Sequence, residues 1–204
     1  MPLSALEFIP LTEDLELLPF KCKDDDLNDF FFNDAKLYLK ELMAVTYLFI
    51  DPNKQKTAAY FSLLNDKVSY DPEEPSFWNR LNRKITNRKR RRNYPSVKIG
   101  RLAVSQDYTG QGIGREILNF IKHAFTNGNR TGCRFITVDA YADATEFYQK
   151  NGFDFFTRKD ERDDTRLMYF DLKPFKEAQE KEKKIIHKQT ITQTKTKEIT
   201  NFIH

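Results

Sequence analysis

The chain has 204 residues, of which 39% are hydrophobic and 14% aromatic, enough to bury the core of one domain with some length left over. No run reaches the roughly eighteen apolar residues of a membrane-spanning helix, and the first residues lack the basic and apolar regions of a signal peptide. We therefore expect a cytoplasmic protein with no membrane contact. Cys22 and Cys133 are far apart and lack metal-ligand spacing, so we expect two reduced thiols, no disulfide framework and no metal site.

The net charge of +4 is distributed unevenly along the chain. Residues 80–92 hold eight Lys or Arg and no acid, and residues 173–204 hold eight Lys against four Glu, so these segments contribute +8 and +4. With a total of +4, all other residues together carry −8. Positive charge concentrated in this way indicates an anionic partner.

The first third of the chain predicts a strand, a helix and a hairpin. Residues 6–11 alternate weakly as a strand, and the aspartates at 24–26 suit the start of a helix over 25–41. Apolar side chains recur every three or four residues on one face of that helix, namely Leu27, Phe31, Ala35, Tyr38 and Leu42, with Phe30 and Phe32 widening the face. Residues 44–50 and 57–64 are rich in β-formers and flank a turn signal, which predicts an antiparallel hairpin.

The rest of the chain alternates strands and helices around a long connection. Residues 66–95 are too long for a tight turn, so we interpret them as a basic insertion over one end of the sheet, with a short helix near 76–86. The pattern then predicts strands at 96–104 and 133–139, made parallel by a crossover helix at 112–125, a short helix at 143–150, and a closing hairpin of 153–156 and 166–172.

These elements define an α/β (α+β) fold, with a mixed, mostly antiparallel sheet of six to seven strands and helices on both faces. We expect one domain over residues 1–172. Residues 173–204 read as a charged extension, helical near 177–184 and rich in Thr, Lys and Gln beyond.

Three glycines, Gly110, Gly112 and Gly114, stand at alternate positions between a strand and a helix. Glycine lets a backbone approach a ligand closely, and a helix start presents unpaired N–H groups, so this loop suits a phosphate. A Walker A loop needs Lys followed by Ser or Thr after its last glycine, and a dinucleotide fingerprint needs Gly or Ala at position 115. Arg115 and Glu116 fit neither motif.

Three motifs together resemble the GNAT superfamily of acetyl-CoA-dependent N-acetyltransferases. They are GRLAV at 100–104, GQGIG at 110–114 and ATEFYQKNGF at 144–153, and the resemblance spans residues 5–172. It implies that the strand end offers backbone groups to pantetheine and that loop N–H groups hold the pyrophosphate of acetyl-CoA. The implied cofactor residues are Leu102, Ala103, Val104, Thr109, Gly110, Gln111, Gly112, Ile113, Gly114, Arg115 and Tyr141.

Two positions depart from the family pattern. Thr109 replaces the usual Arg or Gln, so one pyrophosphate contact must come from a hydroxyl, Gln111 or Arg115, and Tyr141 replaces an Asn that often contacts pantetheine. Tyr148 matches the general acid of the family, and a phenol of pKa about 10 is protonated at neutral pH and can donate to a departing thiolate. The preceding strand carries no carboxylate that could act as a general base. Glu146 or Asp139 could act through water, and an α-amine acceptor would need a strong base less than a lysine acceptor does.

The acceptor is left open between three hypotheses. The first is a small amine, peptide or protein. The second is the α-amine of aminoacyl-tRNA, because residues 20–30, with Ala35 beyond, look like the opening of the toxin-like branch that acetylates it, and because a basic run would attract RNA. That run is Arg88, Lys89, Arg90, Arg91 and Arg92, and a toxin would imply an antitoxin protein as partner. The third is a catalytically degraded module that binds coenzyme A or RNA. The sequence is compatible with a monomer or a homodimer.

Overall fold

The structure is a computed structural model that describes residues 2–73, 75–85, 92–128 and 131–202. Side chains are described for these residues up to 186 and for 189. Within these ranges no helix is both long and apolar enough to cross a lipid bilayer.

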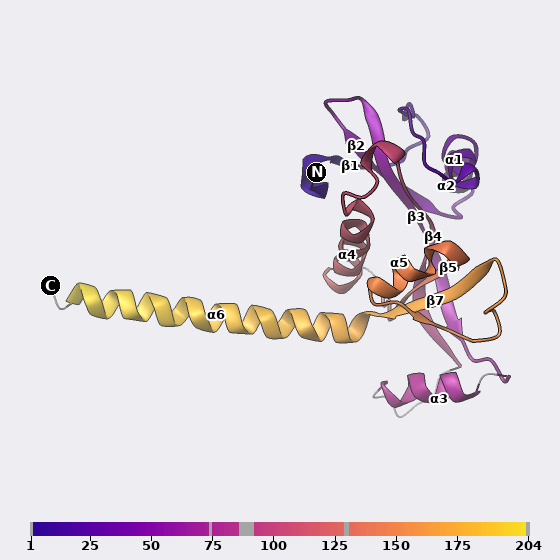
Figure 1. Cartoon of the computed structure of the whole chain (residues 1–204). Coiled ribbons are helices and arrows are strands. Elements are labelled where there is room, and N and C mark those ends of the chain that lie inside the picture. Colours follow the sequence, from indigo (N-terminus) through magenta and orange to yellow (C-terminus); the bar gives the residue numbers. More distant parts are fainter. Residues whose placement is uncertain (1, 74, 86–91, 129–130, 203–204) are drawn as a thin grey trace.

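A seven-stranded sheet forms the centre of the molecule, in the order β1-β2-β3-β4-β5-β7-β6 (Figure 1). The strands are β1 (Glu7–Pro10), β2 (Val45–Asp51), β3 (Lys56–Ser69), β4 (Asn93–Val104), β5 (Phe135–Tyr141), β6 (Asp154–Phe155) and β7 (Thr165–Asp171). Neighbouring strands pair antiparallel except β4 and β5, which are parallel because the helix between them returns the chain across the sheet. This arrangement confirms the predicted fold class.

Helices cover both faces of the sheet, as predicted (Figure 1). They are α1 (Asp25–Asp29), α2 (Ala35–Lys40), α3 (Pro75–Arg83), α4 (Ile113–Thr126), α5 (Thr145–Lys150) and α6 (Leu172–Phe202). On one face α4 and α5 bury a core that includes Ile117, Ile121 and Met168. On the other face α1 and α2 bury Phe31 and Ala35 against the sheet.

The helix predicted over 25–41 contains a π-helical turn, Phe30–Asp34, between α1 and α2. Asp24 caps it as expected, because its carboxylate accepts a hydrogen bond from the Leu27 N–H at 3.1 Å. The wider turn lets both Phe30 and Phe31 face the core. Leu42 is a correction to the predicted apolar face: it follows the helix at φ 56° and is 92% exposed.

The segment interpreted as an insertion, 66–95, begins and ends as sheet. β3 and β4 pair as far as Ser69 and Asn93, so the sheet continues well beyond the predicted strand boundaries. The connection carries α3, near the predicted helix, which buries Phe77, Trp78 and Leu81. These side chains pack against strand residues such as Tyr94, Phe135 and Tyr169 and fix α3 at one end of the sheet (Figure 1).

The C-terminal helix α6 leaves the sheet at Leu172, which is buried. It is one continuous helix where the sequence predicted a helical segment only at 177–184. Its first turns pack on α4, where Phe175 meets the ring of His123 and the Gln179 amide lies 3.2 Å from His123 Nδ1. Beyond these turns α6 projects away from the domain (Figure 1).

Lys122 of α4 is a buried cation that anchors the end of α5. It is 4% exposed and donates a hydrogen bond of 2.7 Å to the carbonyl of Asn151, at the C-terminus of α5. Its ammonium lies 4.3 Å from the ring centroid of Phe170 and has no ion-pair partner among the described residues. Burial lowers the pKa of Lys122 from its ordinary 10.5 to about 8.

This lowered pKa predicts a stability that rises with pH. Between about pH 8 and 10.5 the unfolded chain holds a proton on Lys122 that the folded chain lacks, so the free energy of unfolding increases, by about 3 kcal/mol in total. Urea unfolding of wild type and Lys122→Met across this range measures the difference. The Lys122→Met variant should lack this rise, and parallel pH profiles for the two proteins would contradict the assignment.

Candidate active site

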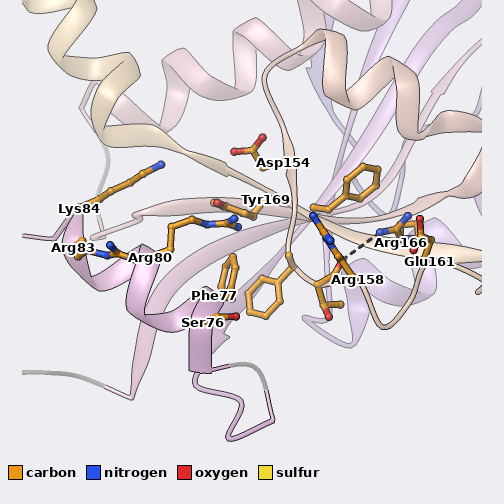
Figure 2. Close-up of a pocket in the computed structure, with 13 residues that line it drawn as sticks. Ser76, Phe77, Arg80, Arg83, Lys84, Asp154, Arg158, Glu161, Arg166 and Tyr169 are labelled. Atoms are coloured by element: carbon orange, nitrogen blue, oxygen red, sulfur yellow. Dashed lines mark hydrogen bonds between the residues drawn. The ribbon is translucent and has the colours of Figure 1, made fainter.

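Two sizeable cavities are lined by residues of the described part of the chain. The larger, of about 870 Å³, lies between α3 and the strands β6 and β7 (Figure 2), and its lining includes no residue predicted to bind acetyl-CoA or to act as the acid. The smaller, of about 540 Å³, lies where β4 and β5 diverge and is lined by Tyr148. The second cavity is therefore the candidate active site.

The cleft exists because β4 and β5 pair over only part of their length. Residues 96–99 of β4 pair with residues 135–138 of β5, and beyond this point β4 continues to Val104 on β3 alone. At the point of divergence Gly100 falls at a register shift, and a Cβ on it would lie 2.7 Å from Leu64 Cδ2. The edge of residues 100–104 that faces β5 is thus left without a strand partner in the described chain.

The predicted pantetheine residues lie on this edge. Leu102 lines the cleft, whereas the side chain of Ala103 is 3% exposed and packs toward α1 and α2. Val104 packs toward α4 and α5. Their backbone, rather than their side chains, is therefore what the open edge presents to a ligand.

Tyr148 lies at the inner wall of the cleft. It is 6% exposed, and its ring packs between Phe147 and Phe153 at centroid distances of 5.1 and 5.3 Å. Its hydroxyl makes no hydrogen bond within the described residues, so its proton is available to a ligand. Burial raises the pKa of Tyr148, and the phenol stays protonated at neutral pH.

The glycine loop leads into the N-terminus of α4, which no side chain caps. Gly110 and Gly112 have φ of 78° and 81°, the left-handed region that glycine adopts without strain. Gly112 is the N-cap of α4, and no side chain caps this end. The first N–H groups of α4 therefore point outward with the positive end of the helix dipole, which fits a pyrophosphate.

The side chains of the loop are placed differently from its backbone. Ile113 is buried in the core, so only its N–H can serve a ligand, and a Cβ on Gly114 would press on the Phe147 ring at 3.2 Å. The Thr109 hydroxyl donates to the Ser105 carbonyl at 3.3 Å. Arg115 is exposed at the helix start, and the Gln111 amide donates to the Asp107 carbonyl at 3.3 Å.

A buried polar pair fixes the base of this loop. Tyr108, 1% exposed, donates a hydrogen bond of 2.7 Å to Asp51, which also accepts the N–H groups of Asn53 and Lys54. The bond from Tyr108 holds the pKa of Asp51 below its ordinary value. The turn after β2 and the glycine loop are thereby held together.

Tyr141 lies at the mouth of the cleft. Its hydroxyl donates to Asp26 of α1 at 3.1 Å, and Asp26 lies 3.7 Å from Arg101 of β4. Arg101 in turn lies over the ring of Phe30, 4.9 Å from its centroid. Tyr141 thus joins the ends of β5, α1 and β4, and its contact with a cofactor stays a prediction.

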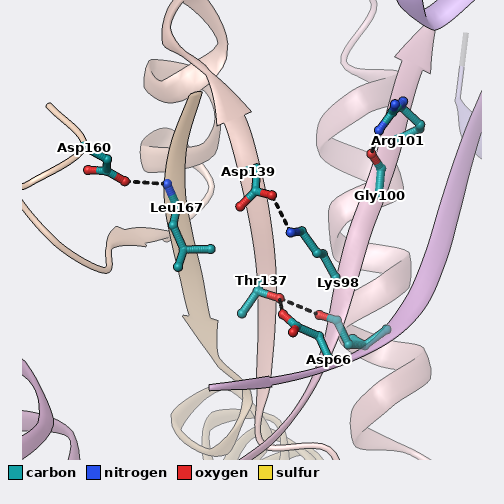
Figure 3. A network of polar contacts seen from close by, with 9 residues as sticks. Asp66, Lys98, Gly100, Arg101, Thr137, Asp139, Asp160 and Leu167 are labelled. Carbon is teal, nitrogen blue, oxygen red and sulfur yellow. Dashed lines mark hydrogen bonds and ion pairs between the residues drawn. The ribbon is translucent and has the colours of Figure 1, made fainter. Parts of the chain in front are cut away.

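The two carboxylates considered as general bases have different surroundings. Asp139 lines the cleft and forms an ion pair with Lys98 across the diverging strands (Figure 3). Glu146 pairs with Lys150 at 2.7 Å, is exposed on α5 and is not among the lining residues. Asp24 and Asp143 also line the cleft. From the sequence, the aspartates at 24–26 were predicted only to start a helix.

The predicted basic run falls largely outside the described part of the chain. Arg88, Lys89, Arg90 and Arg91 are not described, and Arg92 is exposed, with its carbonyl accepting the N–H of Tyr70 at 2.8 Å. Cys22 and Cys133 are both free thiols. No group of three or more His, Cys, Asp or Glu able to hold a metal ion occurs among the described residues.

Part of the chain is similar to a known family of domains. Residues 82–154 match the family model described as the acetyltransferase (GNAT) domain, which spans the glycine loop and Tyr148. No curated protein matches the sequence. The chain therefore contains a stretch that matches a GNAT acetyltransferase domain, a kind of domain that takes its acetyl group from acetyl-CoA.

Solved structures with this fold include several toxins. An AtaT toxin carrying a Tyr-to-Phe mutation, bound to the C-terminus of the antitoxin AtaR and to acetyl-CoA, is 19% identical with a TM-score of 0.65 over 83% of this chain and 95% of that one. A Tyr-to-Phe mutant of KacT is 19% identical with a TM-score of 0.67, over 85% and 99%. AtaT complexed with acetyl-methionyl-tRNAfMet is 20% identical with a TM-score of 0.66, over 83% and 96%.

Proposed function

We propose that this protein transfers the acetyl group of acetyl-CoA to a primary amine that enters the cleft between β4 and β5. The observation that carries the proposal is the position of Tyr148, a buried phenol that lines the cleft and whose hydroxyl has no hydrogen-bond partner in the described chain. Acetyl-CoA supplies the acetyl group as a thioester. Residues 1–172 form the catalytic domain in this proposal, and residues 173–204 are an extension of it.

Different residues around the cleft bind the cofactor and transfer the proton. The N–H groups at the start of α4, from Gly112 to Gly114, hold the pyrophosphate, and the open edge of β4 at residues 102–104 binds the pantetheine arm. Tyr148 holds a proton at its hydroxyl and gives it to the departing thiolate. The other cofactor contacts we assign are Thr109, Gln111, Arg115 and Tyr141.

The amine must lose a proton as it is acetylated, and the cleft offers no strong base for this step. Among the lining carboxylates, Asp139 is paired with Lys98, Asp24 accepts the Leu27 N–H at the start of α1, and Asp143 is exposed. An α-amine has a pKa near 7.7 to 8.0, against about 10.4 for lysine, so a larger fraction of it is neutral at pH 7. The site therefore favours an α-amine over a lysine side chain.

The α-amine of an aminoacyl-tRNA is the acceptor that these features favour. It has the low pKa that the cleft requires, and residues 80–92 of the chain hold eight Lys or Arg, a charge that would attract an RNA backbone. AtaT, a structural neighbour, has been solved with acetyl-methionyl-tRNAfMet, which supports this choice. The neighbour bound to AtaR likewise supports a protein antitoxin as partner.

Release of free coenzyme A thiol in the presence of different amines tests the proposal. With acetyl-CoA present, we expect rapid thiol release with charged tRNA and slow release with polyamines, free amino acids and peptides. Deacylated tRNA is the matched control, because it offers the same phosphates without the amine. Faster turnover of a polyamine or peptide would assign a different acceptor, and no turnover with any amine, despite tight binding of acetyl-CoA, would indicate a degraded enzyme.

A further inference from the structure

The larger cavity, between α3 and the strands β6 and β7, has a floor of aromatic rings (Figure 2). The rings of Phe77 and Phe156 lie 4.0 Å apart between centroids, and Tyr169 meets Phe77 edge-on at 5.4 Å. Phe156 is half-buried, so part of this aromatic surface is open to a ligand. A volume of about 870 Å³ is in the range of cavities that hold small ligands.

Cations line this floor from two sides. Arg80, Arg83 and Lys84 come from the end of α3, and Arg158 comes from the loop after β6 (Figure 2). All four are exposed, and none forms an ion pair with a carboxylate in the described chain. A fifth cation, Arg166, is different, because Asp160 pairs with it at 2.7 Å. With only Asp154 and Glu161 as acids in its lining, the cavity has a surplus of positive charge.

An ion-paired loop holds the two walls in place. Lys159, next to Arg158, lies 2.6 Å from Glu73 and 3.9 Å from Asp71, both in the connection between β3 and α3. Arg80 is held in turn over the Phe77 ring, 5.4 Å from its centroid. The cations are therefore brought together by the fold rather than scattered on a surface.

The cavity and the active-site cleft are neighbours along one strand. Thr165, at the start of β7, lines the cleft, whereas Arg166 and Tyr169 of the same strand line the basic cavity. Four residues of strand span about 13 Å. Exposed Asp139 and half-buried Leu167 lie between them, so this strip of sheet is accessible to solvent (Figure 3).

We propose that this basic cavity binds the phosphate groups of a nucleic-acid acceptor while its amine-bearing end lies in the cleft between β4 and β5. The inference rests on the proposed function, because it takes that cleft as the place of acetyl transfer. Arginines bind phosphate oxygens in pairs of hydrogen bonds, and the half-buried ring of Phe156 among them leaves aromatic surface on which a base can stack. An acidic peptide would use the charge but not the aromatic floor, so the cavity fits RNA better.

Binding of labelled RNA in the absence of acetyl-CoA tests the site separately from catalysis. The probes are deacylated tRNA and a short single-stranded RNA, measured by fluorescence anisotropy between about 50 and 200 mM salt. The test variant is Arg80→Gln/Arg83→Gln/Arg158→Gln. The matched control is Lys181→Gln/Lys183→Gln/Lys184→Gln on exposed positions of α6, which removes the same charge away from the cavity.

We expect the test variant to bind RNA about a hundredfold more weakly at low salt and to lose about two units of the slope of log Kd against log salt. The control should keep a slope close to wild type. Arg158→Gln alone, in a loop, should lose a smaller part of the slope if the triple variant does not fold.

Equal losses in the test and control variants would mean that only net charge matters and would overturn the proposal. Unchanged RNA binding in the test variant, with weakened binding of an acidic peptide, would overturn it in favour of a protein partner. Loss of RNA binding confined to the test variant would support the cavity even if charged tRNA were not acetylated, in which case the proposed acceptor fails and the binding site stands.

Discussion

Tyr148→Phe should lower kcat by about a hundredfold or more while leaving the affinity for acetyl-CoA nearly unchanged. General acid catalysis contributes about 10²- to 10⁴-fold, and this substitution removes only the proton donor. The ring stays between Phe147 and Phe153, and the hydroxyl has no hydrogen-bond partner in the described chain, so stability should change by less than about 0.5 kcal/mol. Steady-state kinetics with a saturating acceptor, together with calorimetric binding of acetyl-CoA, measure both effects.

The control for this experiment is Tyr70→Phe, which removes a phenol hydroxyl from a partly exposed ring beside Trp78, outside the cleft. Its kcat should equal that of wild type. Because burial raises the pKa of Tyr148, the wild-type enzyme should also retain its acid up to at least about pH 10, with no loss of rate from this group below that pH. Equal turnover by wild type and Tyr148→Phe would remove Tyr148 from the mechanism.

Gly112→Ala should raise the KM for acetyl-CoA about tenfold. The N-cap of α4 has φ 81°, where a Cβ costs about 1–2 kcal/mol, so the loop will relax and turn its N–H groups away from the pyrophosphate. Loss of one hydrogen bond to a charged group, worth about 1.5–3 kcal/mol, corresponds to a tenfold change or more. Initial rates at varied acetyl-CoA concentration measure the change.

The matched control is Gly128→Ala, at the other end of α4. Gly128 also has a positive φ, of 70°, and nothing lies within 4 Å of its added Cβ. Both variants should therefore lose a similar amount of stability in urea unfolding, whereas only Gly112→Ala should change KM. A similar rise of KM in both variants would show that general destabilisation, and not the loop, is responsible.

The strands and helices could be predicted from the sequence where apolar residues recur with a clear period. Errors arose where strand pairing or backbone geometry set the bounds of an element. The strand predicted at 57–64 extends to Ser69 because its partner β4 continues beside it. Residues 65–69 are mostly polar, so their sequence gives no sign of this strand pairing. Leu42 fits the helical period, but the helix ends before it, and the chain turns there with a positive φ.

The glycine loop and Tyr148 could be predicted from the sequence, because a glycine pattern before a helix and a tyrosine within a family motif are properties of short segments, and their roles stay predictions. The divergence of β4 from β5, the pairing of Asp139 with Lys98 and the link from Tyr141 to Asp26 join residues far apart in the chain. Only the tertiary structure could bring them together. The same holds for the basic cavity. Arg80 and Arg158 belong to different elements, and they line one cavity because α3 packs on β7.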